Sequence, residues 1–240
     1  MSAPDHSLTL HPAAQLWLFD FDNTLVALEE TVNWNESRRE LEPMLRAAGC
    51  PPQWFEEFPR GNLLLYDAIR HRIEAQVFTP TLPARDLLQR ASNIIEYHEL
   101  AGVDVAKPLP GAVDLLSELA ARQIPAAIVT SNSSRTAVRW LARARLVHTV
   151  RIVVGRDTLL ALKPAPDMIR RALEHCKTAA SDALFVGDSD ADLRAAKAAG
   201  VRFFAIAPGI ERRNRMSEGG AAAAFSSPAQ LLATLRTAPA

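Results

Sequence analysis

Five short apolar runs, each ending in polar residues, limit the fold of this chain more than any other feature of its sequence. The runs cover residues 16–20, 126–130, 151–155, 183–188 and 201–206. Because they do not alternate between apolar and polar residues, they are typical of parallel strands buried on both faces. Stretches with helix-capping signals separate the later runs. The alternation predicts an α/β fold with a Rossmann-like, doubly wound parallel sheet.

One connection is much longer than a sheet of this kind needs. Residues 26–125 separate the first run from the second, whereas a crossover needs only about a dozen residues. The helical pattern at 111–123 supplies that crossover. Further helical patterns, punctuated by proline and glycine, lie at 35–49, 62–75 and 84–102. We therefore expect an α/β core formed by 15–25 and 107–240, and a helical cap domain formed by 26–106.

The composition is that of a soluble globular protein and disfavours several function classes. Hydrophobic residues make up 48% and charged residues 22%, and Lys plus Arg equals Asp plus Glu at 27 each. A net charge of zero gives no electrostatic attraction to nucleic acid or to an anionic membrane. There is neither an apolar run long enough to span a membrane nor a signal-peptide pattern. We therefore expect a cytoplasmic protein that binds neither nucleic acid nor membrane.

Polar residues cluster where the predicted strands end, which is where ligands bind in open α/β sheets. They are Asp20 and Asp22 after the first run, Thr130, Ser131 and Asn132 after the second, Lys163 before a predicted helix, and Asp188 and Asp192 after the fourth run. Each of them alone is more typical of a turn, a cap or the surface. Together, acids, one lysine and hydroxyl donors at one edge indicate a divalent cation that holds a phosphate.

Four short motifs appear in an order that resembles the haloacid dehalogenase (HAD) superfamily of phosphohydrolases. They are DFDNT, VTSN, KPAPD and GDSDADLRAA, which begin at residues 20, 129, 163 and 187. The resemblance extends from Trp17 to about Ala207, and the position of the insertion resembles the C1 cap of phosphoglycolate phosphatase-like members. Asn23 stands where the superfamily commonly has glycine. Asparagine tolerates left-handed backbone angles better than most residues, so we expect the same turn.

Attack of a carboxylate on a phosphate explains why such a site needs cations. Two unit charges about 4 Å apart repel by roughly 4 kcal/mol at an effective dielectric constant of about 20, and a dianion roughly doubles this. Asp20 and Asp188 are the expected Mg²⁺ ligands, and the resemblance adds the main-chain carbonyl of Asp22. Lys163 is expected to be the second cation. Asp192 is expected to be an outer ligand that holds a metal-bound water or orients Lys163.

The two acids of the first motif are expected to have different roles, because neighbouring carboxylates push their proton affinities apart. Asp20 remains ionised beside the cations and acts as the nucleophile. Asp22 carries the proton, protonates the leaving alcohol and then accepts a proton from the hydrolytic water. The Thr130 hydroxyl and the Ser131 backbone N–H are expected to donate to the phosphoryl oxygens, with Asn132 in the same substrate-binding loop.

The predicted cap offers one candidate for reading the substrate. Arg60 lies in a loop rich in proline and glycine that can reach over the site, although a solvated arginine is the alternative. We expect Trp34 to lie in the apolar core of the cap. The basic run at 212–215 is expected on a solvated face.

The leading functional hypothesis is a Mg²⁺-dependent phosphohydrolase that cleaves a small phosphomonoester through an aspartyl-phosphate intermediate. The resemblance leaves open a phosphoglycolate phosphatase-like or a 5′-nucleotidase-like substrate. A phosphomutase or phosphotransferase of the same superfamily, and a non-catalytic phosphate-binding domain, are the alternatives. The expected partner is a small phosphorylated metabolite. A monomer is the default, and a homodimer stays open.

Overall fold

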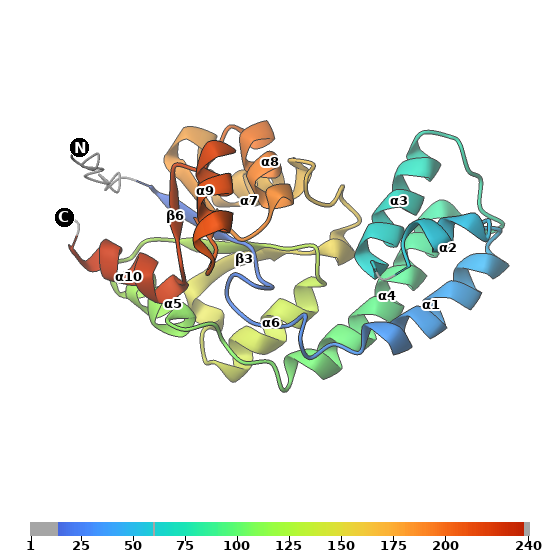
Figure 1. The fold of residues 1–240 in the computed structure, drawn as a ribbon, viewed down its shortest axis with the longest axis horizontal. Coiled ribbons are helices and arrows are strands. Elements are labelled where there is room, and N and C mark those ends of the chain that lie inside the picture. Colours follow the sequence, from blue (N-terminus) through green and yellow to red (C-terminus); the bar gives the residue numbers. More distant parts are fainter. Residues whose placement is uncertain (1–13, 60, 238–240) are drawn as a thin grey trace.

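The computed structural model describes residues 14–59 and 61–237, and Figure 1 shows the sheet between two layers of helices. Among these residues, six strands form one sheet in the order β3-β2-β1-β4-β5-β6, and all neighbouring strands are parallel. The strands are β1 (Leu16–Phe19), β2 (Ala126–Val129), β3 (Val150–Val154), β4 (Ala183–Gly187), β5 (Arg202–Ile206) and β6 (Ala223–Phe225). The predicted doubly wound α/β fold is confirmed. Because β1 is central, its C-terminal end is flanked by the ends of β2 and β4.

Helices cover both faces of the sheet because β1 is apolar on both sides. Leu16 and Leu18 pack towards one face, and Trp17 and Phe19 towards the other, as alternation along an extended strand requires. The first face carries α7 (Asp167–Cys176), α8 (Asp190–Ala199) and α9 (Ile210–Glu218). The second face carries α5 (Ala112–Ala121), α6 (Ser134–Arg143) and α10 (Pro228–Thr237). Single 3-10 turns lie at η1 (Val147–Thr149), η2 (Arg156–Thr158) and η3 (Ala180–Asp182).

The long connection after β1 is helical and lies at one side of the sheet (Figure 1). We call its helices the helical insertion: α1 (Trp34–Ala47), α2 (Gln53–Glu57), α3 (Asn62–Glu74) and α4 (Ala84–Val103). Leu41, Leu65, Ile69 and Ile95 are buried in the insertion and belong to the same apolar cluster as the first face of the sheet. Of the helices within the described ranges, none has the length and apolar character to cross a bilayer.

The two connections between the insertion and the sheet run side by side. Val26 forms an isolated bridge with Asp22 and another with Pro108. The Ala27 N–H donates to the Lys107 carbonyl at 3.0 Å. The chain therefore leaves the sheet and returns to it at almost the same place, directly beside the end of β1.

Candidate active site

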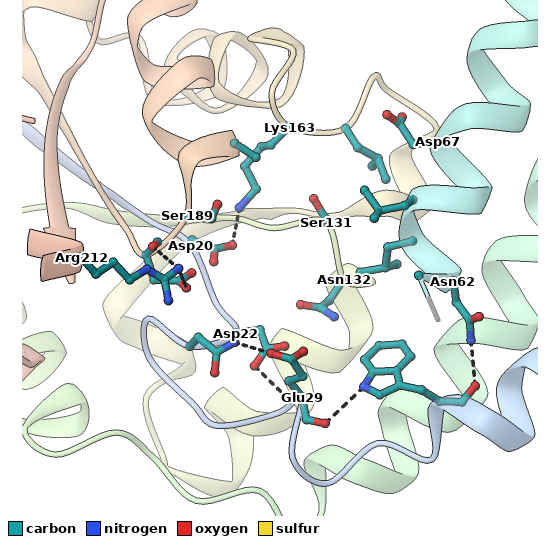
Figure 2. Close-up of a pocket in the computed structure, with 18 residues that line it drawn as sticks. Asp20, Asp22, Glu29, Asn62, Asp67, Ser131, Asn132, Lys163, Ser189 and Arg212 are labelled. Carbon is teal, nitrogen blue, oxygen red and sulfur yellow. Dashed lines mark hydrogen bonds and ion pairs between the residues drawn. The ribbon is translucent and has the colours of Figure 1, made fainter. Parts of the chain in front are cut away.

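A cavity of about 510 Å³ lies at the C-terminal ends of β1, β2 and β4 (Figure 2). On the sheet side it is lined by Asp20, Asp22, Asn23, Ser131, Asn132, Leu162, Lys163, Asp188, Ser189, Ala191 and Arg212. On the side of the insertion it is lined by Glu29, Trp34, Gly61, Asn62, Leu63, Leu64 and Asp67. The structure thus brings most of the residues predicted from the four motifs to one cavity.

Strand β1 carries both acids of the first motif to this cavity. The Asp20 N–H donates to the Val186 carbonyl at 2.8 Å, so pairing with β4 holds the backbone of Asp20 in place. Phe21 is fully buried against Trp140 of α6, with 5.7 Å between ring centroids, and points away from the cavity. Asn23 has a φ of 57°, which is the left-handed conformation that its position in the motif requires.

Lys163 is the buried cation of the site. Its side chain is 5% exposed, and its ammonium contacts the carboxylate of Asp20 (Figure 2) and, at 2.5 Å, that of Asp192. Burial by itself lowers the pKa of an ammonium, but the Asp192 and Asp20 carboxylates outweigh it and raise the pKa of Lys163 above its usual value. Lys163 is therefore charged and is held between two acids.

Three buried carboxylates form a cluster around this lysine. Oxygen atoms of Asp20, Asp188 and Asp192 lie within 4.8 Å of one another. Burial, together with the neighbouring carboxylates, raises the pKa of Asp20 and of Asp188 well above the usual range of an aspartate. Each raised pKa means that the ionised form lacks solvation, so further positive charge at this point would stabilise it.

Asp192 is fixed by the start of α8. Its Oδ2 accepts the Ser189 N–H at 3.0 Å, while the Ser189 hydroxyl accepts the Asp192 N–H at 3.2 Å, and together these bonds form a capping box. The other oxygen of Asp192 faces Lys163. Asp192 therefore both caps α8 and positions Lys163.

Gly187 leaves no room for a side chain beside Asp192, since an added Cβ would lie 2.7 Å from the Cβ of Asp192. We expect Gly187→Ala to lower the stability by about 1–3 kcal/mol, the usual effect of overpacking. Thermal unfolding measures this loss. Gly209→Ala is the matched control, because nothing lies within 4 Å of its added Cβ. Equal melting temperatures for the two variants would contradict the prediction.

Asp22 differs from Asp20 in its partners. Its Oδ1 accepts the N–H groups of Leu28 at 2.9 Å and of Glu29 at 3.0 Å. Burial raises the pKa of Asp22 to about 7, although the Glu29 N–H opposes this effect. Asp22 therefore exchanges a proton close to neutral pH.

The loop after β2 contributes Ser131 and Asn132 to the cavity wall. The hydroxyl of Thr130 is fully buried and bonds within the loop. It donates to the Asn132 Oδ1 at 3.1 Å and accepts the Asn132 N–H at 3.0 Å. In this structure the Thr130 hydroxyl therefore shapes the loop, while the next two residues face the cavity.

Arg212 is a site residue that the sequence did not predict. It donates to the Asp188 carbonyl at 2.6 Å and to the Asp188 Oδ2 at 3.0 Å, and it reaches the cavity from α9 (Figure 2). Its side chain is 43% exposed, in keeping with the solvated face expected at 212–215, but it also lines the cavity. The position of Arg212 could have been inferred from the topology, because Arg212 follows β5, whose C-terminal end lies at the same edge of the sheet.

The insertion supplies a mixed apolar and polar wall. Trp34 packs against the apolar core, as expected, but it also lines the cavity, and its Nε1 donates to the Glu29 carbonyl at 3.2 Å. Asn62 and Asp67 of α3 were not anticipated as lining residues. The predicted Arg60 lies outside the described residues.

Comparison with known proteins identifies the family. A family model described as haloacid dehalogenase-like hydrolase matches residues 63–206. The chain belongs to the haloacid dehalogenase-like hydrolase family. This hydrolase is 30% identical over 209 residues to phosphoglycolate phosphatase 1 of Pseudomonas aeruginosa, covering 85% of this chain and 73% of the relative. It is also 30% identical over 228 residues to the phosphoglycolate phosphatase of Pseudomonas fluorescens, covering 92% of this chain and 77% of that relative. The predicted class, a phosphohydrolase, is confirmed.

Solved structures of the family share the fold of this hydrolase. A mutant form of CbbY from Rhodobacter sphaeroides, in complex with xylulose-(1,5)-bisphosphate, has a TM-score of 0.62 at 24% identity, covering 91% of this chain and 96% of the other. A hydrolase from Pseudomonas syringae has a TM-score of 0.61 at 21% identity, covering 92% of this chain and 96% of the other.

Proposed function

We propose that this hydrolase is a Mg²⁺-dependent phosphatase that cleaves a small phosphomonoester through an aspartyl-phosphate on Asp20. The observation that carries the proposal is the contact of Lys163 with Asp20 and Asp192, at a cavity that Asp22 and Asp188 also line. A nucleophilic carboxylate, a fixed cation and a second acid with a near-neutral pKa are the groups that two-step phosphate hydrolysis requires.

The donor set fits a hard divalent cation. Carboxylate oxygens of Asp20 and Asp188 lie close together at an accessible cavity, and both have raised pKa values that added positive charge would lower. Asp20, Asp188 and the main-chain carbonyl of Asp22 would hold Mg²⁺, with Asp192 behind them. When bound, Mg²⁺ supplies positive charge that offsets the repulsion between the carboxylate and the phosphate.

The protein's own groups account for both steps. An Asp20 carboxylate oxygen forms a bond to phosphorus, the bond from phosphorus to the ester oxygen breaks, and Asp22 gives its proton to the leaving alcohol. In the second step Asp22 takes a proton from water as the water oxygen bonds to phosphorus and the Asp20 oxygen leaves. Lys163 neutralises charge on Asp20 and on the phosphoryl oxygens throughout.

The loop of residues 130–133 is proposed to hold the phosphoryl group. Ser131 and Asn132 line the cavity, and the Ser131 backbone N–H would donate to the phosphoryl group. The hydroxyl of Thr130 supports this loop in the described structure, and its predicted contact with the phosphoryl group requires a change of partner. Donors of this kind stabilise charge that spreads over the phosphoryl oxygens in the transition state.

Residues 26–106 are proposed to be a cap domain that covers the cavity and contacts the leaving group. Trp34, Asn62 and Asp67 already line the cavity from this side, and Arg60 remains a predicted contact. Phosphoglycolate is the first substrate to test, because it is named for relatives at 30% identity. We propose a monomer as the default oligomeric state, and a homodimer is the alternative.

Removal of metal tests the proposal. We expect EDTA to lower hydrolysis of p-nitrophenyl phosphate by at least about 100-fold and added Mg²⁺ to restore it, because the repulsion at Asp20 is then no longer offset. Phosphate release from phosphoglycolate, sugar phosphates and nucleotides then ranks the substrates. Hydrolysis that is unchanged after dialysis against EDTA would contradict metal dependence. The absence of hydrolysis with every divalent cation would contradict the phosphatase assignment.

A further inference from the structure

A second charged cluster lies behind the cavity wall and takes no part in the proposed chemistry. Glu99 of α4 and Arg156 of η2 are both fully buried and form a two-pronged ion pair. The Arg156 guanidinium reaches Glu99 Oε1 at 2.8 Å and Oε2 at 3.0 Å. We call these two residues the buried pair.

The remaining hydrogen bonds of the buried pair go largely to one short loop. Glu99 accepts the Asn132 Nδ2 at 3.0 Å and the Ser133 N–H at 3.0 Å. Arg156 donates to the Ser131 carbonyl at 2.9 Å through its guanidinium, and its backbone N–H donates to the Asn132 carbonyl at 2.8 Å. Each of the three residues of this loop, 131–133, is therefore hydrogen-bonded to Glu99, to Arg156 or to both.

Stability alone does not explain such a pair. Removing two charges from water is costly, and well-packed apolar residues often match or exceed the stability of a buried ion pair. An arginine fork on a carboxylate does fix geometry, because both groups are planar and the bonds are directional. The geometry fixed here is that of Ser131 and Asn132, which line the cavity.

We propose that Glu99 and Arg156 are positioning residues that hold the 131–133 loop in the conformation that binds the phosphoryl group. This inference rests on the proposed function, in which that loop holds the phosphoryl group. Glu99 also belongs to α4, the last helix of the insertion. The conformation of the phosphate-binding loop is thus determined partly by a helix of the insertion and partly by the strand that precedes the loop.

A double substitution separates positioning from stability. Glu99→Gln alone leaves Arg156 buried without its counter-charge, so we expect a clearly lower melting temperature. Glu99→Gln combined with Arg156→Met buries no charge and keeps an oxygen acceptor, so most of the melting temperature returns. If the pair positions the loop, kcat/KM of this double variant stays at least about 10-fold below that of the wild type, as expected for a misplaced binding group.

A more conservative variant covers the case in which the double variant does not fold. Arg156→Lys keeps the buried charge but loses the fork, so we expect a folded protein whose kcat/KM is again reduced. Asp104→Asn is the matched control. Asp104 also ties α4 to α6, by accepting from Arg139 at 2.6 Å, but on the surface and away from the loop. We expect its kcat/KM to stay within about twofold of the wild type, as for most surface pairs.

Binding of inorganic phosphate, measured by titration calorimetry, gives a readout that needs no turnover. We expect its Kd to rise by about 10-fold in the double variant and in Arg156→Lys, and to stay unchanged in Asp104→Asn. Wild-type kcat/KM and phosphate affinity in folded pair variants would overturn the inference while leaving the proposed function intact. If the wild type binds phosphate without hydrolysing any ester, the proposed function fails, and the phosphate affinities still decide the role of the pair.

Discussion

Asp20→Asn is expected to abolish turnover, with kcat lowered by about 10⁴-fold or more, as loss of a covalent nucleophile commonly does. An amide is too poor a nucleophile to attack phosphorus. The fold should survive, because Asn has the shape of Asp and Lys163 keeps its contact with Asp192. A carboxyl group whose pKa is raised by folding destabilises the protein above its unfolded pKa. Removal of the ionisable Asp20 carboxyl group should therefore leave the melting temperature at neutral pH equal or higher.

Phosphate release and thermal unfolding, measured on the same preparation, test this expectation. Asp190→Asn is the matched control, since Asp190 is an exposed acid of the fourth motif, next to the cluster but not part of it. The control should retain nearly full activity. Substantial turnover in the Asp20 variant would exclude an aspartyl-phosphate on this residue, and a large drop in melting temperature would attribute the loss to misfolding.

Asp22→Asn has the second largest expected effect, a fall in kcat of about 10²–10⁴-fold, which is the usual contribution of general acid–base catalysis. The amide oxygen can still accept the Leu28 and Glu29 N–H groups, so the loop should keep its conformation. With an activated ester that needs no acid, such as p-nitrophenyl phosphate, the first step continues while hydrolysis of the aspartyl-phosphate slows. Mass spectrometry should then find a phosphorylated chain.

The pH dependence gives an independent check of this role. With a pKa of about 7, Asp22 is protonated below neutral pH, as protonation of the leaving alcohol requires, and ionised above it, as activation of water requires. The kcat of the wild type should therefore change near pH 7. This change should be absent from the pH profile of Asp22→Asn. Asp190→Asn is again the control, because Asp190 is an exposed acid that does not line the cavity. An unchanged pH profile with no phosphorylated chain would refute the assignment.

The sheet could be predicted because a strand buried on both faces must be apolar throughout. For β1, β2 and β4 that pattern also predicts which residues meet at one edge, and hence the positions of Asp20, Ser131 and Asp188. Helix α9 was not predicted because only Met216 among its residues is buried, so its sequence lacks the periodic apolar stripe of a packed helix. Arg212 was missed with it.

Other parts of the site depend on contacts that a linear sequence does not display. Glu99 and Arg156 are 57 residues apart and lie outside the four motifs, so nothing local indicates their pairing. The Thr130 hydroxyl was expected at the phosphate because its position in the motif predicts it. Its bonds to Asn132 become visible only once the loop is folded. Asn23 is the opposite case, because its φ of 57° follows directly from the turn chemistry of its motif.

The central place of β1 in the sheet has a consequence for folding. Trp17 pairs with Ala126 on one side and with Leu184 on the other, so β1 joins the sheet only by closing loops of about 100 residues or more, at an entropic cost that grows with loop length. The helices of the insertion pack on one another, and Val26 lies next to Pro108. Once the insertion has folded, the segment left to close between β1 and β2 is short. The helices beside the active site therefore also lower the entropy lost when the strand that carries Asp20 enters the sheet.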